Sequence, residues 1–521
     1  MTITRAHLFW RRTAAALVAL ALFLCCFPAP EAALAASDGM VRVRLTRLGA
    51  RSSLSFTTTC AYYVDGNTAR AIPAGAQATV EATGGQLYLT VNGSLTALGA
   101  SCTLARGEGG ARGIRFTSPS VSGLYCGDLM LSVSGGSIVP ILRIYIEDYL
   151  YGVVGYEMSA SWPLEALKAQ AVAARNYALR CMSTRSSNAY HMVDTASDQV
   201  FRGYEGSSSV IQAVDETRNM ALYAGSAIAS CYYSASNGGQ TEATRNVWGG
   251  NLSYSTVKDD PYDLANPSAT VKTAAIRRDA TGLDERLMQA LRQGAGGAEI
   301  AAILDIEPHS PKYAAPSRLY TKLRFTVETV DARRFSVDVD TYGALEAWYG
   351  LSINSSSNET VYVEESADGF TIAFRRWGHG VGMSQRGAQW MAGEYGMDYI
   401  EILNFYYPGM TLETIDWPEV ELTPLEELPE SIGSARPRPT PTPTPAPLPA
   451  LEEGEYYATV ELETRSSSLN VRQQPSTSAR IVAALDYGRR VIVCEDAGDG
   501  WVRIRTAELE GYVKLEYLKA E

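Results

Sequence analysis

Residues 146–178 read IEDYLYGVVGYEMSASWPLEALKAQAVAARNYA, and the rest of the chain is organised around this stretch. Its second half predicts a helix. Ser161 can cap it, Pro163 fits a first turn where a missing N–H costs nothing, and Glu165 faces the positive helix end. The helix is expected to bury one stripe, because its apolar residues recur at spacings of three and four: Leu164, Leu167, Ala171, Ala174 and Ala178.

Glu157 is the candidate for acid–base chemistry in this stretch. It precedes the expected helix, on a turn flanked by Gly155, Tyr156 and Trp162. A carboxyl held between aromatic side chains suits a proton donor, because desolvation raises its pKa. By residue type alone, a solvated or structural glutamate is the more common alternative.

Two parts of this first motif resemble the signature of the stage II sporulation protein D family (SpoIID/LytB): EDYLYGVVGYEM at 147–158 and SWPLEALKAQAVAARNYAL at 161–179. The resemblance implies a lytic transglycosylase that cuts the glycan strands of peptidoglycan. It implies that Glu157 is the catalytic acid and that Arg175 is a second position important for activity. Tyr156, beside the acid, is expected to bind substrate.

A second motif, ASCYYSASNGGQTE at residues 229–242, is an aromatic run that ends in a polar, glycine-rich turn. Such turns present hydroxyl and amide groups to ligands. The motif resembles the family's YxSxSxG block, which lines the cleft, and this implies Ser234 and Ser236 as substrate-binding residues. An ordinary turn is the alternative. Trp248 suits stacking on a pyranose ring or a place in the core equally well.

The third motif, RWGHGVGMSQRGA at residues 376–388, has glycines that free the backbone for close approach, and a helix is expected to begin near Ser384. The motif also resembles the family. His379 and Gln385 are therefore expected to contact the glycan or to orient Glu157. A structural role for His379 in its own turn is the alternative.

Some relatives carry a cysteine and a histidine that bind zinc, and Val193 and Ser197 stand near those places in this chain. Neither residue ligates zinc. His191 is expected to be a surface histidine. We therefore expect no bound metal and no other cofactor.

The composition is that of a globular protein, with 46% hydrophobic and 20% charged residues among 521. The formal net charge of −12 argues against nucleic acid or an anionic membrane as the main partner. The six cysteines outside the N-terminal segment allow several pairings, and isolated buried thiols with at most one bridge are favoured: Cys60, Cys102, Cys126, Cys181, Cys231 and Cys494.

The chain divides into five expected regions. Residues 1–36 form a signal peptide, because arginines precede an apolar run and an Ala-Leu-Ala cleavage site. Residues 37–130 are β-rich, and residues 131–418 form the SpoIID/LytB-type domain. Residues 419–455 are a linker rich in proline and threonine. Residues 456–521 resemble a bacterial SH3-like barrel. The expected fold class is α+β with a small all-β barrel.

The expected function is that of an exported, modular protein that acts on the glycan strands of peptidoglycan. It would do so at the extracellular face of the membrane or in the cell wall. It would contact the membrane only if the N-terminal segment is retained as an anchor. The competing hypothesis is a non-catalytic enhancer of a wall amidase, which is the role linked to the LytB branch. A structural adaptor has no positive support in the sequence.

Overall fold

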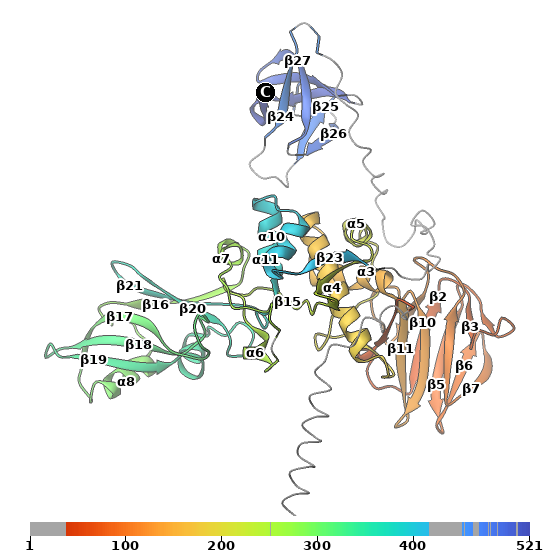
Figure 1. The fold of residues 1–521 in the computed structure, drawn as a ribbon, viewed down its shortest axis with the longest axis horizontal. Helices are drawn as coiled ribbons and strands as arrows, with labels where there is room; N and C mark the ends of the chain where they lie inside the picture. Colours follow the sequence, from red (N-terminus) through yellow and green to blue (C-terminus); the bar gives the residue numbers. More distant parts are fainter. Residues whose placement is uncertain are drawn as a thin grey trace, which may run out of the picture.

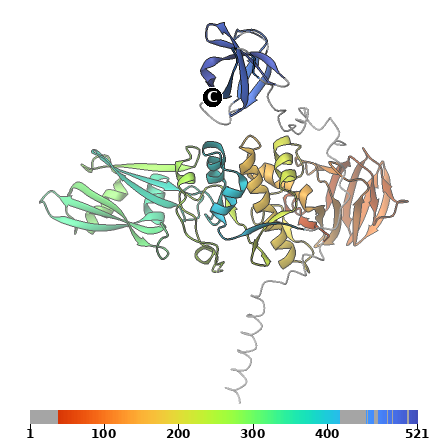
Figure 2. The ribbon, with the colours of Figure 1, turned by 45° about the horizontal axis from the view of Figure 1, so that its top comes forward.

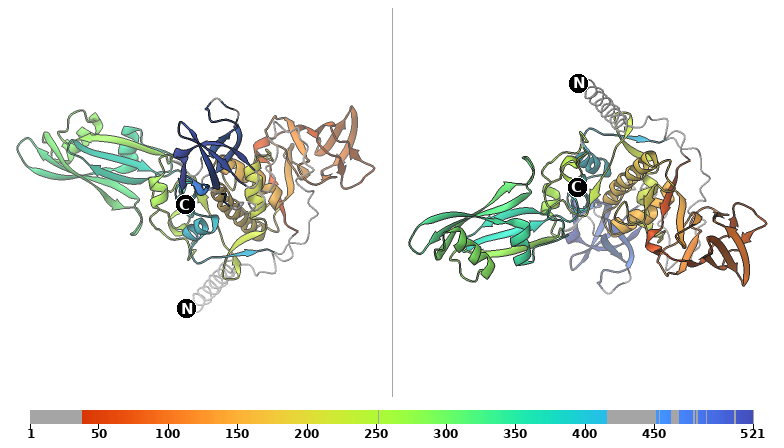
Figure 3. Two further views of the ribbon diagram at one scale, coloured as in Figure 1. Left: turned by 90° about the horizontal axis from the view of Figure 1, so that it is seen from above. Right: turned by 90° about the horizontal axis from the view of Figure 1, so that it is seen from below.

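The computed structural model describes residues 38–415 except 251, and residues 451–520 except 453, 462–467, 478, 480, 487, 507 and 508. The expected signal peptide and residues 419–450 of the expected linker lie outside the described residues. Figure 1 shows a β-sandwich, a central group of helices and a second β-rich lobe following one another along the long axis. The views from above and below keep the sandwich and the lobe at opposite ends of the helices (Figure 3).

The N-terminal region is a two-sheet sandwich. Strand β2 alternates half-buried and buried side chains, as period-two patterning requires, and Phe56 packs edge-on against Phe116 at 6.1 Å between ring centroids. One sheet has the order β7 (Ser94–Gly99), β6 (Gln86–Val91), β5 (Gln77–Thr83), β2 (Ser53–Thr58) and β9 (Ile114–Ser118). The other has the order β12 (Met192–Val193), β1 (Met40–Arg44), β11 (Ser137–Tyr145), β10 (Asp128–Ser134), β8 (Ser101–Arg106), β3 (Tyr62–Val64) and β4 (Ala71–Ile72).

Asn92-Gly93 and Gly135-Gly136 each reverse the chain between two antiparallel strands. Asn92 and Gly93 have φ of 49° and 82° between β6 and β7, the positive angles that a tight two-residue turn needs. Gly135 and Gly136 likewise have φ of 57° and 76° between β10 and β11. A short 3-10 helix, η1 (Thr46–Leu48), follows β1.

The helices at the centre share the sandwich's hydrophobic core (Figure 2). They are α3 (Ile146–Glu157), α4 (Leu164–Thr184), α5 (Ser208–Glu216), α10 (Gln385–Glu394) and α11 (Tyr399–Tyr406). Helix α4 contacts α3, α5, α10 and α11, and its many alanines allow that close packing.

Helix α4 differs in two ways from the sequence prediction. Residues around most of its circumference are buried rather than one stripe alone, because other elements surround it. Ser161 does not cap it: Pro163 occupies the N-cap position without a side-chain hydrogen bond, and the hydroxyl of Ser161 contacts that of Ser159 instead. The predicted turn around Glu157 is also wrong, because Glu157 is the last residue of α3.

A β-rich lobe lies between the second and third motifs and has its own hydrophobic core. It holds two three-stranded sheets, with orders β16-β21-β20 and β17-β18-β19. Its elements are β16 (Val271–Arg277), α8 (Glu285–Gly294), β17 (Ile300–Pro311), β18 (Tyr320–Thr329), β19 (Arg334–Asp340), the π-helical η2 (Thr341–Glu346), α9 (Ala347–Tyr349), β20 (Thr360–Glu365) and β21 (Gly369–Arg375).

Short strands and helices connect the lobe to the helical centre. The parallel pairing of β15 with β22 joins the second motif to the third. These connecting elements are β13 (Met220–Ala224), β14 (Ala227–Ile228), β15 (Tyr233–Ser234), α6 (Thr244–Val247), α7 (Pro261–Ala265), β22 (Met383–Ser384) and β23 (Thr411–Thr414).

The C-terminal region is a separate antiparallel β-structure with a third hydrophobic core. Its strand order is β26-β25-β29-β28-β27-β24-β30. Its elements are β24 (Tyr456–Val460), β25 (Ser468–Arg472), β26 (Ile481–Asp486), β27 (Arg490–Gly498), β28 (Trp501–Arg505), β29 (Glu510–Lys514), the 3-10 helix η4 (Leu515–Tyr517) and β30 (Leu518–Ala520).

The α+β class with an added all-β domain is thus confirmed. In the ranges that the structure describes, no helix combines the length and apolar character needed to cross a membrane. The six cysteines at positions 60 to 494 are all unbridged in the same ranges, and five of them are buried.

Candidate active site

Glu157 ends helix α3 with a half-buried carboxyl that faces two hydrogen-bond donors. The backbone N–H of Val200 donates to its Oε1 at 3.3 Å, and the side-chain amide of Gln385 donates to its Oε2 at 3.3 Å. Burial raises the pKa of Glu157, and the two donors only partly oppose this effect. A carboxyl whose acid form is favoured by burial suits the role of a proton donor.

Helices α4 and α10 complete the surroundings of Glu157. Helix α10 begins where the sequence predicts. The Ser384 hydroxyl accepts from the N–H of Gly387 and caps this helix, which places Gln385 at the first helical position. Gln385 also donates to Oε1 of Gln170, a fully buried residue of α4, at 3.3 Å. Helices α3, α4 and α10 are therefore joined by hydrogen bonds through Gln385, next to the carboxyl of Glu157.

Sequence reasoning missed Gln170, although a signal for it exists. It lies three residues after Leu167 and four before Ala174, so it is a polar residue on the predicted buried stripe. Gln199 is a second missed residue: it donates to the hydroxyl of Tyr233 at 2.7 Å and accepts from Tyr149 at 3.3 Å.

The structure does not bring Arg175 to the carboxyl of Glu157. Its guanidinium forms a bidentate pair with Glu147, with Nε–Oε1 and Nη2–Oε2 distances of 2.8 and 2.7 Å, and both side chains are fully buried. Its Nη1 donates to the carbonyl of Met220 at 3.0 Å. Arg175 therefore fastens the start of α3 to α4, and it reaches Glu157 only through the length of α3.

Tyr156 is the most exposed of the predicted site residues, with 44% of its surface accessible. The guanidinium of Arg202 lies over its ring at 3.9 Å from the centroid and donates to its hydroxyl at 2.7 Å. Since Val200 contacts Glu157, this aromatic ring and its cation lie at the edge of the same site.

Ser234 and Ser236 are buried and hold the loop of the third motif. The hydroxyl of Ser234 accepts from the N–H of Gly380 at 3.2 Å, and the hydroxyl of Ser236 donates to Asp263 at 3.0 Å. The backbones of Ser236 and Trp377 also pair with each other. Through these contacts the two serines hold the loop at residues 376–382 in place.

His379 occupies that loop beside two aromatic rings. Its Nδ1 accepts from the N–H of Val381 at 3.0 Å, as expected for a residue that stabilises its own turn. Burial lowers its pKa to about 4, so the ring is neutral at neutral pH. The ring of Trp248 packs against His379 at 4.9 Å and against Tyr232 at 4.8 Å, yet half of Trp248 is exposed.

A buried polar network that the sequence analysis missed lies next to the start of α10. Asp260 accepts from Asn237 at 2.6 Å and from Tyr406 at 2.7 Å, and burial raises its pKa to about 6. Asp263 accepts from the Ser384 hydroxyl at 2.5 Å, which ties the network to the cap of α10. The Asp-Pro pair at 260–261 was the available signal, since Asp260 caps α7.

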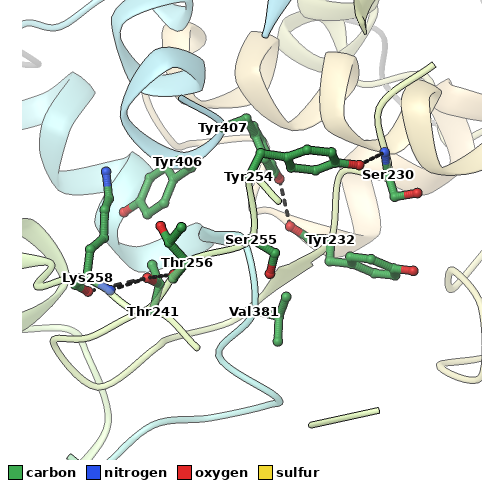
Figure 4. Close-up of a pocket in the computed structure, with 11 residues that line it drawn as sticks. Ser230, Tyr232, Thr241, Tyr254, Ser255, Thr256, Lys258, Val381, Tyr406 and Tyr407 are labelled. Atoms are coloured by element: carbon green, nitrogen blue, oxygen red, sulfur yellow. Dashed lines mark hydrogen bonds between the residues drawn. The ribbon is translucent and has the colours of Figure 1, made fainter. Parts of the chain in front are cut away.

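A small pocket lies next to this network, and Tyr406 belongs to both (Figure 4). Tyr407 donates to the carbonyl of Tyr232 at 2.7 Å, and Tyr254 accepts from the N–H of Ser230 at 2.7 Å. The free space of about 10 Å³ is room for about one water molecule, so this pocket is too small for a sugar.

The region expected to have lost its zinc ligands is closed by hydrogen bonds. The N–H of Val193 donates to Asp198 at 2.9 Å. His191 is buried rather than on the surface, contrary to the prediction, because its Nδ1 accepts from the N–H of Arg42 at 3.1 Å. Across the described part of the chain, no three His, Cys, Asp or Glu side chains are grouped as metal ligands.

Comparison with known proteins supports the resemblances. A family described as "Stage II sporulation protein" matches residues 134–223, and a "Bacterial SH3 domain" matches residues 467–519. The chain is 32% identical over 291 residues to the "Amidase enhancer" of Bacillus subtilis (strain 168), a match covering 50% of this chain and 40% of that protein.

Two further relatives are covered more fully. An uncharacterised protein of Brachyspira hyodysenteriae is 32% identical over 294 residues, covering 55% of this chain and 72% of that protein. "Stage II sporulation protein D" of Bacillus subtilis (strain 168) is 27% identical over 291 residues, covering 53% and 76%. The chain spans less than half of the amidase enhancer's length.

The fold and these matches define a two-module protein, a helix-centred α+β region followed by a bacterial SH3 domain. The chain belongs to the stage II sporulation protein D family, and the resemblance seen in the sequence is confirmed. The matched residues 134–223 include Glu157, Gln170 and Arg175.

Proposed function

We propose that this protein is an exported peptidoglycan lytic transglycosylase that acts in sporulation or in cell-wall remodelling. The observation that carries the proposal is the half-buried carboxyl of Glu157, held by the N–H of Val200 and the amide of Gln385, with its pKa raised by burial. The family match supports the substrate class that we assign, the glycan strands of peptidoglycan.

In this mechanism Glu157 serves first as acid and then as base. Its proton passes to the glycosidic oxygen as the C1–O bond breaks. The carboxylate then accepts the proton of the sugar's own 6-hydroxyl, and O6 bonds to C1 to close a 1,6-anhydro ring. The masses of the two products sum to that of the substrate, because no water is consumed. One carboxyl is enough, whereas most glycosidases use two.

Exposed aromatic rings beside the site supply the expected sugar contacts. Tyr156 neighbours Glu157, and Trp248 lies against His379 on the loop that leads to Gln385. A pyranose ring packs its C–H face on such rings. The SH3 domain would add affinity for the wall, and the apolar segment at residues 1–36 would direct export.

The test is mass spectrometry of purified glycan strands after incubation with the full chain. We expect 1,6-anhydro-muramyl ends, lighter by one water than hydrolytic ends. Glu157→Gln should lower the rate about 10²–10⁴-fold or more, because proton transfer is lost at both steps. Glu394→Gln makes the same chemical change at the exposed end of α10 and should leave the rate unchanged. Reducing ends, or full activity in Glu157→Gln, would contradict the mechanism.

The relative named "Amidase enhancer" favours a second candidate, a wall-binding protein that stimulates an N-acetylmuramoyl-L-alanine amidase. Under this alternative the chain leaves glycan strands intact, and it raises the rate at which an added wall amidase releases peptides. Glu157→Gln should then stimulate the amidase as well as the parent chain does.

A further inference from the structure

The amide of Gln385 faces two oxygens at once. Its Nε2 lies 3.3 Å from Oε2 of Glu157 and 3.3 Å from Oε1 of Gln170, so its two hydrogens serve one acceptor each. Gln170 is fully buried, and its own Nε2 has no hydrogen-bond partner. Both hydrogens on Nε2 of Gln170 therefore lack an acceptor in the described chain. Leaving a buried amide unpaired in this way costs free energy.

This orientation of the amides suits a carboxylate and not a carboxylic acid. The proton of neutral Glu157 belongs on Oε2, because Oε1 faces the N–H of Val200, which cannot accept. On Oε2 the proton would face the NH₂ group of Gln385, donor against donor. A neutral Glu157 therefore needs an acceptor at that place.

Rotation of both amides by 180° supplies the acceptor and repairs the unpaired donor. The oxygen of Gln385 would then accept from protonated Glu157 and, with its second lone pair, from Nε2 of Gln170. The oxygen and nitrogen of an amide have nearly the same size, so the rotation leaves the packing of α4 and α10 unchanged. Each form has two hydrogen bonds among these three side chains, but only the acid form gives Nε2 of Gln170 a partner.

We propose that Gln170 is a positioning residue that acts on Glu157 through Gln385, and that paired rotation of the two amides accommodates Glu157 as an acid before proton transfer and as a carboxylate after it. The inference rests on the proposed role of Glu157 as acid and then base. The titratable groups near Glu157 are Tyr149, on the same helix α3, and Tyr233, on β15, and burial keeps both phenols neutral by raising each pKa well above 10.

The test follows the protonation of Glu157 directly in the full chain. The infrared carboxyl band that Glu157→Gln removes is titrated with pH in the parent and in Gln170→Met, which keeps the side-chain length without the amide. We expect the midpoint in Gln170→Met to move to lower pH, with proton affinity about two- to tenfold weaker, because the carboxylate form no longer leaves a buried amide without a partner. Gln212→Met, which removes an exposed amide of α5, should leave the midpoint unchanged.

Two further measurements keep the inference falsifiable. Gln170→Asn retains the amide but is one methylene too short to reach Gln385, so it should move the midpoint in the same direction even if Gln170→Met does not fold. In active protein the pH–rate profile should move with the band, whereas a merely structural role would lower the rate without moving the profile. An unchanged midpoint in a folded variant overturns the inference. Absence of glycan cleavage by the parent would instead overturn the proposed function, and the band would still test the amide pair.

Discussion

Glu157 owes its chemistry to its partners in the fold more than to its sequence neighbours. Of the residues beside it, Tyr156 is exposed and Met158 is buried. In the described chain neither of them donates a hydrogen bond to its carboxyl. Its donors are Val200 and Gln385, which lie 43 and 228 positions away. Burial in the fold raises the pKa of Glu157 against the effect of these two donors, so the shift is a property of the assembled site.

At the same scale, Arg175 and Glu147 form a buried pair whose disruption should affect stability before chemistry. Arg175→Met leaves the carboxylate of Glu147 buried with only the N–H of Asn219, at 3.2 Å, as its remaining hydrogen-bond donor in the described chain. We expect a loss of about 3–5 kcal/mol in the free energy of unfolding, measured by denaturant titration of the full chain.

The double variant Arg175→Met/Glu147→Leu is the control, because it removes both charges. It should recover part of the loss. Folded Arg175→Met should keep most of its glycan-cleaving rate if Arg175 acts only by fastening α3 to α4. Unchanged stability with a lost rate would place Arg175 in contact with substrate.

At the scale of elements, helix α10 carries Gln385 and is anchored from below. Gly387 lies one turn into the helix, where the Tyr406 hydroxyl passes close by on its way to Asp260. A Cβ at residue 387 would lie 1.9 Å from that hydroxyl and 3.0 Å from a carboxylate oxygen of Asp260. Only a glycine fits between α10 and this network.

Gly387→Ala should therefore destabilise the domain by about 1–3 kcal/mol from overpacking, and it should slow glycan cleavage by displacing Gln385. Gly393→Ala is a matched control in the same helix, because its Cβ would lie 3.4 Å from Pro163, an almost ordinary contact. That change should be neutral or stabilising by up to about 1 kcal/mol. Thermal unfolding followed with a rate assay separates the two. Equal behaviour of both variants would show that the network does not set the position of α10.

At the scale of the whole molecule, the described chain has three separate hydrophobic cores. The sandwich and the central helices share one core, and the lobe at residues 271–375 has another. The lobe touches the site's loop through Asn358, which donates to the carbonyl of Gly378 at 2.9 Å. The SH3 domain has a third core, so it should fold without the rest.

Truncation after Pro424 tests what the SH3 domain contributes. The shortened chain should keep its fold and its rate on soluble glycan strands, because the site lies wholly in residues 146–407. Its co-sedimentation with purified sacculi should weaken, since a tethered second module adds effective concentration. Equal pelleting of the two chains would exclude the SH3 domain as the main wall anchor.

The sequence by itself determined the fold class and the hairpins, and it singled out Glu157 as a candidate residue. Period-two alternation marks the strands around Asn92 and Gly135, and the turn residues mark where they reverse, because both signals are local. The motif around Glu157 and the C-terminal SH3 pattern are contiguous stretches as well. Local signals failed at the helix ends, where Ser161 was expected to cap α4 and Glu157 to lie outside a helix, and at His191, which is buried rather than on the surface.

Only the tertiary structure decided which residues surround the acid. The pairing of Gln385 with Gln170 joins positions 215 apart, and that of Arg175 with Glu147 holds Arg175 away from the carboxyl of Glu157. Periodicity reports whether a side chain is buried and not what it meets there. A buried polar residue must find its partner in the fold, and that choice is made when α3, α4 and α10 pack together.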